Sequence, residues 1–184
     1  MLKKAQHVIG RTLWDQSNVL AINPNVTYYF CNETLRPEFY SGEVWNYQKC
    51  NKHVIFLSQA YYPVKGLHQV LKAMPYILKQ YPDTKVRIAG CDNTNMSTFN
   101  YRLRISGYGK YIKKLIQKYK LQECVTYVGE LTAEEMRREY LQSNVFICPS
   151  SIENSPNSIC EAQILGVPHI ASYVGGIPDL MSGN

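Results

Sequence analysis

The sequence predicts an α/β protein with a doubly wound, Rossmann-like parallel sheet. Five short apolar runs alternate along the chain with longer segments of helical periodicity. Runs that are apolar throughout, rather than at every second residue, indicate strands buried on both faces, as in a parallel sheet covered by helices. Ligands of such sheets bind at the carboxyl ends of the strands. The predicted strands cover residues 54–58, 86–89, 125–128, 145–148 and 169–172.

Three segments between these strands have the apolar spacing of amphipathic helices. The first covers residues 67–78, and Pro75 within it should either kink the helix or mark its start. The second covers residues 108–119. The third begins with a capping box at residues 132–135 and has Tyr140 on its inner face.

The segment 145–164 combines the fourth strand, a short polar loop and a helix start. Ser155 is a suitable N-cap, Pro156 suits the first helical position, and Gly166 ends the apolar spacing. A helix start after a strand presents free backbone N–H groups and the positive end of the helix dipole. Because both favour an anion, the sequence predicts a phosphate site here.

Two glutamates frame that site, Glu153 in the loop and Glu161 in the helix. A carboxylate close to a phosphate repels it, so each glutamate must face another group. Vicinal hydroxyls are the natural partner, because one carboxylate can accept hydrogen bonds from two of them. The segment is therefore expected to bind a phosphorylated sugar.

The spacing Glu153-x7-Glu161, set in PSSIENSPNSICEAQILGVPHIASYVGGIPD, resembles the E-x7-E signature of the retaining glycosyltransferases of family 4, the glycosyl transferases group 1, which have the GT-B fold. The resemblance covers residues 54–184 strongly and identifies them with the C-terminal, donor-binding half of that fold. It implies that the two glutamates contact the donor sugar and the ribose, and that the amides between them hold the diphosphate. The implied donor-binding residues of this stretch are Asn154, Ser155, Pro156, Asn157 and Ser158.

A second matching stretch opens the first helix. Family 4 enzymes have a K-G dipeptide where this chain has Lys65-Gly66, and the resemblance implies that Lys65 contacts the donor diphosphate. The family commonly adds an arginine shortly before this lysine, whereas this chain has Gln59 at the nearest position. The resemblance therefore includes Gln59 and Gly66 in the donor site, with one phosphate-binding cation missing.

Two glycine-containing turns complete the resemblance. Glu130 and Leu131 follow the third strand and resemble a family turn whose backbone reads the nucleotide base. Gly175 and Gly176 follow the last strand, where glycines let a backbone approach phosphate or sugar closely. All four residues are predicted to bind the donor.

Residues 1–52 do not follow the same alternation. They contain one short helix-like stretch before Asn23-Pro24, a strand candidate at 26–31 and a polar turn at 32–36. We interpret residues 1–52 as a segment joining the two halves of a GT-B enzyme, and residues 53–184 as the nucleotide-sugar donor-binding domain, truncated at its C-terminus. The polar connection 91–107 is either a functional loop or an insertion.

Composition limits the partners and the compartment. The formal net charge is +6, but the basic residues are scattered, the densest groups being 113–114 and 137–138, and this favours a solvated surface over nucleic-acid binding. An anionic ligand or membrane surface stays open as a partner. Six widely spaced cysteines favour reduced, buried thiols in a cytoplasmic protein. No apolar run could cross a bilayer, so any membrane contact is expected to be peripheral, at the inner face.

Other enzyme classes lack their motifs in this chain. There is no complete G-x-G-x-x-G of nicotinamide enzymes, no G-x4-G-K-[ST] of nucleoside triphosphatases and no Asp-x-Asp of the metal-dependent GT-A glycosyltransferases. The chain is therefore expected to use no metal and no cofactor, with the nucleotide sugar as its substrate.

The resemblance implies transfer of a sugar from a UDP- or GDP-sugar to a hydroxyl of an acceptor glycan or lipid-linked sugar, with retention, in cell-envelope polysaccharide or glycolipid synthesis. Lys65 and Glu153 are the predicted catalytic residues. Lys65 would stabilise the leaving diphosphate, and Glu153 is not assigned as a nucleophile. Two alternatives stay open, a non-catalytic nucleotide-sugar-binding module and a protein similar to nucleotide-sugar epimerases.

Overall fold

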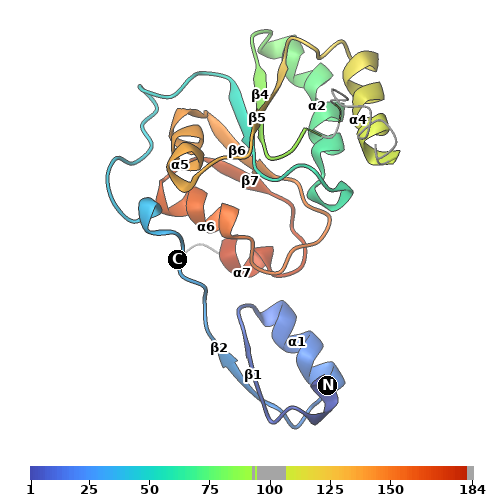
Figure 1. The fold of residues 1–184 in the computed structure, drawn as a ribbon, viewed down its shortest axis with the longest axis vertical. Helices are drawn as coiled ribbons and strands as arrows, with labels where there is room; N and C mark the ends of the chain where they lie inside the picture. The colour runs from blue at the N-terminus through green and yellow to red at the C-terminus, as the bar shows by residue number, and fades with distance from the viewer. Residues whose placement is uncertain (93, 95–106, 182–184) are drawn as a thin grey trace.

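The computed structural model describes residues 1–92, 94 and 107–181, and the polar connection 91–107 therefore lies largely outside the described residues. The main body contains a parallel five-stranded sheet with the order β5-β4-β3-β6-β7 (Figure 1). Within this sheet the first strand in sequence is the central strand β3, the next two, β4 and β5, follow toward one edge, and the last two, β6 and β7, lie on the other side. This order confirms the predicted doubly wound sheet. The expectation that all five strands are buried was wrong for β5 and β7, which contain no fully buried residue, because each lies at an edge of the sheet and has a neighbour on one side only. The strands are β3 (Val54–Leu57), β4 (Lys85–Ala89), β5 (Val125–Gly129), β6 (Val145–Cys148) and β7 (His169–Ala171).

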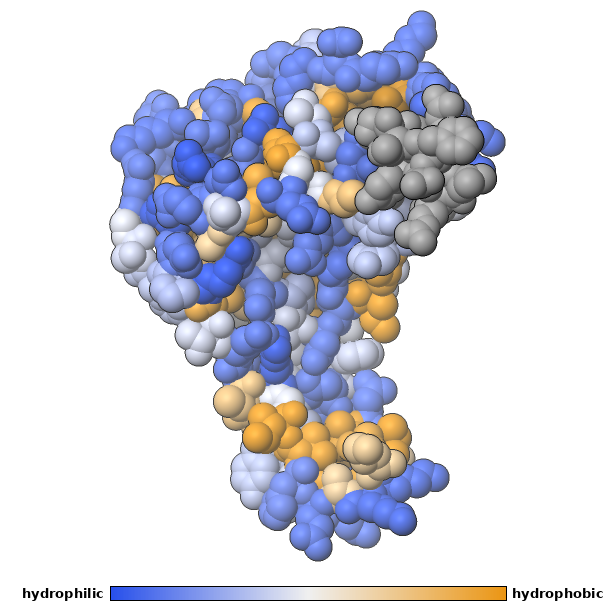
Figure 2. All heavy atoms as spheres, in the orientation of Figure 1, coloured by the Kyte–Doolittle hydropathy of each residue, from blue (hydrophilic) through white to orange (hydrophobic). Residues whose placement is uncertain are grey.

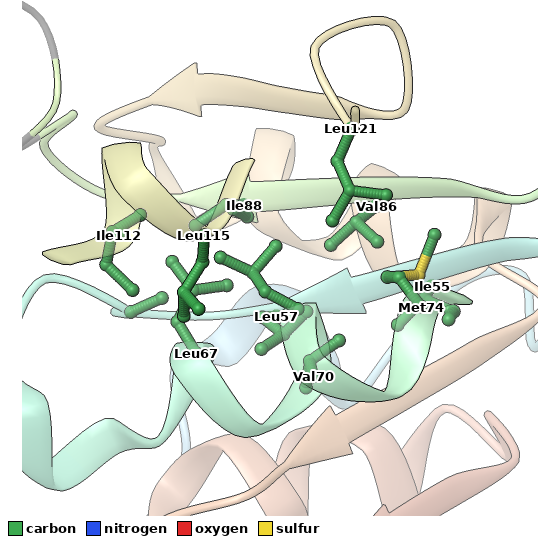
Figure 3. Close-up of a cluster of buried hydrophobic side chains, with 12 residues drawn as sticks. Ile55, Leu57, Leu67, Val70, Met74, Val86, Ile88, Ile112, Leu115 and Leu121 are labelled. Carbon is green, nitrogen blue, oxygen red and sulfur yellow. The ribbon is translucent and has the colours of Figure 1, made fainter. Parts of the chain in front are cut away.

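Helices cover both faces of this sheet. Helices α2 (Leu67–Gln80) and α4 (Gly107–Lys118) pack on one face, while α5 (Ala133–Gln142) and α6 (Asn157–Ile164) pack on the other. Figure 3 shows Leu67 and Val70 of α2 and Leu115 of α4 pointing toward the strands. All four residues of β3 are buried, and because side chains alternate along a strand, its side chains enter both cores. The short helix α7 (Ile177–Met181) follows β7.

The starts of α2 and α5 test two predictions about helix boundaries. Helix α2 begins at Leu67 and contains Pro75 in its interior, so the alternative that Pro75 starts the helix was wrong. Helix α5 begins after Thr132, and its predicted capping box with Glu135 is confirmed. Tyr140 is fully buried, as its predicted inward position requires.

Residues 1–30 form a small lobe of strand, helix and strand, which lies at the lower end of Figure 1. Strand β1 (His7–Gly10) pairs in parallel with β2 (Thr27–Phe30), and α1 (Leu13–Ile22) connects them. The sequence predicted the helix and β2 but missed β1, because four residues with glycine at the end give too short a pattern. Hydrophobic residues gather on this lobe in Figure 2, and Ile9 is 70% exposed.

Short 3₁₀ segments occur at Leu2–Lys4 (η1), Pro37–Phe39 (η2) and Pro63–Lys65 (η3). The six cysteines are all free thiols, as predicted. Cys50 and Cys148 are buried, whereas Cys31 and Cys91 are exposed, so the expectation of buried thiols was wrong for the latter two. Both exposed cysteines lie just beyond strand ends, where the chain leaves the core. No helix among the described residues is both long enough and apolar enough to span a bilayer.

Candidate functional site

A cleft of about 520 Å³ opens at the carboxyl ends of the strands. Its walls come from the loops after β3, β5 and β6, from the start of α6, and from residues 11–36. The sheet order reverses between β3 and β6, and ligands of open α/β sheets bind at such a switch point. The lining residues are Arg11, Glu33, Thr34, Arg36, Ser58, Gln59, Lys65, Leu131, Met136, Ser155, Pro156, Asn157, Ser158 and Glu161.

The start of α6 supplies unpaired backbone donors to this cleft. Pro156 is the N-cap, with φ −72° and ψ 115°, so the helix begins at Asn157 and the predicted N-cap at Ser155 was wrong by one residue. Pro156 has an extended backbone, and it accepts a hydrogen bond from the Ile159 N–H at 3.0 Å. Within the described part of the chain, the N–H groups of Asn157 and Ser158 donate to no protein acceptor. Together with the helix dipole, these two groups form an anion site.

Lys65 reaches the cleft from a turn that only glycine can follow. Gly66 has φ 76°, and a Cβ there would lie 1.9 Å from the carbonyl oxygen of Pro149. The absence of a side chain at Gly66 therefore lets the start of α2 lie directly against the loop that follows β6. This close approach brings Lys65 next to the glutamate of that loop.

Lys65 and Glu153, the two predicted catalytic residues, form an ion pair. Lys65 Nζ donates to Glu153 Oε1 at 2.5 Å, and the Ser150 hydroxyl donates to the same oxygen at 2.9 Å. The side chains of Lys65 and Glu153 are 24% and 15% exposed, so the pair is largely shielded from solvent. The structure thus brings together two residues that are 88 positions apart in the sequence.

Glu161 lies on the floor of the cleft and is 6% exposed. Burial raises the pKa of its carboxyl group above 4.5, while the neighbouring Arg36 acts in the opposite direction. Arg36 Nη2 donates to Glu161 Oε1 at 2.8 Å, and its guanidinium also lies 5.0 Å from the centre of the Phe39 ring. Arg36 is therefore held in place between a carboxylate and an aromatic face.

Arg11 is a third basic residue in the cleft. It forms an ion pair with Glu33, and its Nη1 donates to the Ser155 carbonyl oxygen at 3.4 Å. Arg11 and Arg36 were not predicted as site residues, because both lie in the first 52 residues and more than 120 positions from the α6 start. One phosphate-binding cation was expected to be missing near Gln59, and the cleft contains these two arginines in addition to Lys65.

Besides Glu130, which lines an adjoining cavity, five predicted site residues do not line this cleft: Gly66, Glu153, Asn154, Gly175 and Gly176. Asn154 Nδ2 donates to Asp15 Oδ2 at 2.8 Å, and Asn154 Oδ1 accepts from the Thr12 hydroxyl at 2.5 Å. A Cβ at Gly175 would lie 1.9 Å from the Glu153 carbonyl oxygen, and one at Gly176 would lie 2.2 Å from that of Asn154. Gly175 and Gly176 therefore allow a close approach of the chain's own backbone at residues 153–154, rather than of a ligand. Asn154 connects the loop after β6 to the small lobe through its hydrogen bonds to Thr12 and Asp15.

A second cavity of about 510 Å³ adjoins the first and shares Gln59, Leu131 and Met136 with it. It is lined by the predicted residues Glu130 and Leu131, and by aromatic and small residues. A flat ring could fit against such walls, whereas the first cleft is lined mostly by charged and polar groups. The remaining lining residues are Tyr61, Tyr62, Ala89, Gly90 and Cys91. Among the residues that the structure describes, no group of three or more His, Cys, Asp or Glu residues could hold a metal ion.

Known proteins resemble this chain in sequence. The family described as Glycosyl transferases group 1 matches residues 46–184. The amylovoran biosynthesis glycosyltransferase AmsK of Erwinia amylovora is 29% identical over 129 residues, which cover 65% of this chain and 32% of AmsK. The phosphatidylinositol N-acetylglucosaminyltransferase gpi3 subunit of Schizosaccharomyces pombe is 23% identical over 128 residues, 70% of this chain and 25% of that protein. The chain therefore spans a quarter to a third of the length of these relatives.

Solved structures share the fold. A mutant of S. aureus TarM in complex with fondaparinux, alpha-GlcNAc-glycerol and UDP has a TM-score of 0.77 at 14% identity, over 100% of this chain and 34% of that one. Sucrose-phosphate synthase from Thermosynechococcus elongatus has a TM-score of 0.74 at 22% identity, over 96% of this chain and 43% of that one. These likenesses confirm the predicted fold, that of GT-B glycosyltransferases.

Proposed function

Because the chain belongs to the glycosyl transferases group 1 family, we propose that its cleft binds the diphosphate of a nucleotide sugar, for transfer of the sugar to an acceptor hydroxyl with retention of configuration. The observation that carries this proposal is the convergence of two free N–H groups at the start of α6 with Lys65 and Arg36 in one cleft. Backbone donors and nearby cations are the groups that bind a diphosphate. UDP- and GDP-sugars are the candidate donors.

The two cavities divide the donor between them in this proposal. The diphosphate lies against Asn157, Ser158 and Lys65, and the ribose hydroxyls reach Glu161 on the cleft floor. The base enters the adjoining cavity beside Glu130 and Leu131. A base fits there because aromatic and apolar walls favour a flat ring, while its edge can bond to backbone groups.

Binding of the donor requires an exchange of partners at Lys65. In the structure its ammonium group donates a hydrogen bond to Glu153. When a diphosphate takes that ammonium group, Glu153 loses its cation and can accept hydrogen bonds from the sugar hydroxyls instead. The exchange therefore prepares both predicted catalytic residues in one step.

Cleavage of the bond between the anomeric carbon and the diphosphate leaves negative charge on the phosphate and positive charge on the sugar. Lys65 and the α6 N–H groups stabilise the leaving diphosphate, each donor contributing about 2–4 kcal/mol by the usual oxyanion-type magnitude. The acceptor hydroxyl attacks on the face that the diphosphate leaves, and its proton passes to a diphosphate oxygen. This route retains the configuration without a protein nucleophile.

The names of the relatives indicate two kinds of acceptor. AmsK is named for amylovoran biosynthesis, and the gpi3 subunit is named as a phosphatidylinositol N-acetylglucosaminyltransferase. We therefore propose an acceptor glycan or a lipid-linked sugar, with the protein acting in polysaccharide or glycolipid synthesis on the cytoplasmic side of the membrane.

Calorimetric titration of the chain with UDP, GDP and ADP tests the proposal. We expect at least one diphosphate to bind with and without a chelator, because no metal is needed where cations and N–H groups hold the phosphates. Turnover of sugar nucleotides should stay negligible, since positioning an acceptor can supply about 7–11 kcal/mol of the barrier reduction and the matched segments span only part of the relatives. No binding at millimolar concentration would refute the donor site.

A nucleotide-sugar epimerase and a non-catalytic binding module are the rival functions. An epimerase would interconvert nucleotide sugars without an acceptor, and detection of that reaction in the protein would overturn the transferase. Donor binding combined with no transfer by a longer form of the protein, offered a panel of glycan and lipid-linked acceptors, would assign the binding module.

A further inference from the structure

The positive charge of the chain comes from one face of the main body, the outer surface of α2 and α4. Of the 20 Lys and Arg and the 14 Asp and Glu residues, the segments 67–80 and 107–120 contain seven lysines and no acidic residue. The rest of the chain then has 13 basic and 14 acidic residues, so these two segments account for the whole net charge of +6. We call this surface the lysine face, and its lysines are Lys72, Lys79, Lys110, Lys113, Lys114, Lys118 and Lys120.

All seven lysines are exposed, and they point away from the protein core. Figure 3 shows Val70 and Met74 of α2 and Ile112 of α4 pointing inward, toward the sheet. At 3.6 residues per turn, Lys72 and Lys79 fall on the side of α2 opposite these inward residues. The two helices lie side by side in Figure 1 and pack against each other, so their lysines form one continuous surface.

Tyrosine rings lie among these lysines. Tyr76 is 73% exposed, Tyr111 is 38% exposed, and Lys79 Nζ lies 5.8 Å from the centre of the Tyr76 ring. A groove of about 450 Å³ between the helices is lined by Lys72, Pro75, Tyr76, Lys79 and Tyr119. Tyrosine is favoured at the headgroup level of membranes, because its ring is apolar and its hydroxyl group is polar.

We propose that the lysine face docks onto the surface of a membrane that contains anionic phospholipids. Clusters of four to eight basic residues on amphipathic helices are typical of such surfaces, and each lysine near the surface strengthens binding about fivefold. Helix α4 separates its apolar and lysine-bearing sides clearly, with Ile112 and Leu115 buried. The contact is peripheral and electrostatic, with tyrosine rings at headgroup depth.

The composition of the face favours a membrane over a nucleic acid. Neither helical segment contains arginine, the residue that reads guanine edges and phosphates with its planar fork. Lysine is a flexible point charge, which suits the diffuse negative charge of a headgroup layer. The face is also the outer side of two helices rather than a channel that follows a nucleic-acid backbone.

Docking would also hold the cleft close to the membrane. Helix α2 has 14 residues, so it is about 21 Å long, and its first residue is two positions after Lys65. A lipid-linked acceptor, which belongs to the proposed function above, would then be within reach of the site. The membrane contact itself does not depend on that function.

Vesicle sedimentation with the full chain tests the proposal. The probes are vesicles of phosphatidylcholine alone and vesicles of equal parts phosphatidylcholine and phosphatidylglycerol. We compare the parent chain with the triple variant Lys113→Gln, Lys114→Gln, Lys118→Gln. The matched control is Lys3→Gln, Lys4→Gln, Lys49→Gln, which removes the same charge from exposed positions outside the face.

We expect the parent and the control to bind the anionic vesicles and not the neutral ones. The triple variant should bind about 100-fold more weakly, and high salt should release the parent. The triple variant should bind UDP with the same affinity as the parent, which would show that the membrane contact and the cleft are separate. A Tyr76→Trp variant should show a blue-shifted emission on anionic vesicles, since the ring enters the headgroup layer.

Three results would overturn the proposal. The first is no binding of the parent chain to anionic vesicles, and the second is equal weakening by the triple variant and the control. The third is binding of duplex or single-stranded DNA that depends on the same lysines without binding to vesicles, which would assign the face to nucleic acid. Equal thermal unfolding of all variants would show that none of these differences arises from misfolding.

Discussion

Replacement of Lys65 by alanine should weaken diphosphate binding while leaving nucleoside binding almost unchanged. A hydrogen bond between charged groups contributes about 1.5–3 kcal/mol, and Lys65 is shielded enough for the full range to apply. In the free protein, however, the same ammonium group is already bonded to Glu153 at 2.5 Å, so binding exchanges one charged partner for another. We therefore expect the lower half of that range, or a UDP affinity about 10- to 50-fold weaker.

Calorimetry with UDP and with uridine measures this difference directly. Uridine lacks the diphosphate, so Lys65→Ala should change its affinity by less than about twofold. Lys49→Ala is the matched control, because Lys49 also forms an ion pair with a glutamate, Glu43, but lies outside the cleft. Equal losses for UDP and uridine, or no loss for either, would refute the placement of Lys65 at the diphosphate.

Three further predictions concern Glu161 and Gly66. Glu161→Gln should weaken UDP binding by about 1.5–3 kcal/mol and 2′,3′-dideoxy-UDP binding much less, and equal calorimetric losses would make Glu161 structural. Gly66→Ala should reduce the free energy of unfolding by roughly 1–3 kcal/mol, because the φ of Gly66 is 76° and a Cβ there would meet the Pro149 carbonyl group. Gly107→Ala is the control and should cause no such loss, because a Cβ at Gly107 has open space around it. Equal free energies of unfolding for the two variants in urea would contradict this. Burial raises the pKa of Glu161 above 4.5, so the Glu161 carboxyl group binds its proton more tightly in the folded chain than in the unfolded chain. The free energy of unfolding should therefore fall as pH rises from 4.5 through the raised pKa. Glu161→Gln should remove that slope in urea unfolding at several pH values, and an unchanged slope would assign it to other groups.

The sheet could be predicted from the sequence because its signals are local and repeated. Each buried strand is an apolar run bounded by polar residues, and β6 has the predicted bounds Val145–Cys148. Strand β1 could not be predicted in the same way. Its residues His7–Gly10 are alternately exposed and half-buried, and it pairs with β2, from which helix α1 separates it in the sequence. Four residues carry too little periodicity to reveal such a strand.

The site was predictable where its residues share one local motif. Ser155, Asn157, Ser158 and Glu161 belong to a single strand–loop–helix element, and all four line the cleft. Arg36 could not be found in this way, because it approaches Glu161 from 125 positions away. Ion pairs between distant segments depend on how those segments pack together, and no periodicity or turn signal in the sequence predicts them.

The exchange of partners explains why this cleft should select charged ligands. Arg11, Arg36 and Lys65 are each paired with a carboxylate, namely Glu33, Glu161 and Glu153. A neutral ligand that displaced Glu153 would leave Lys65, whose side chain is 24% exposed, without a counter-charge, which is unfavourable at a partly shielded position. A diphosphate brings its own negative charges and can replace a carboxylate at little cost. The pairing of Lys65 therefore favours a charged ligand over a neutral one, in addition to the preference for anions that the α6 N–H groups provide.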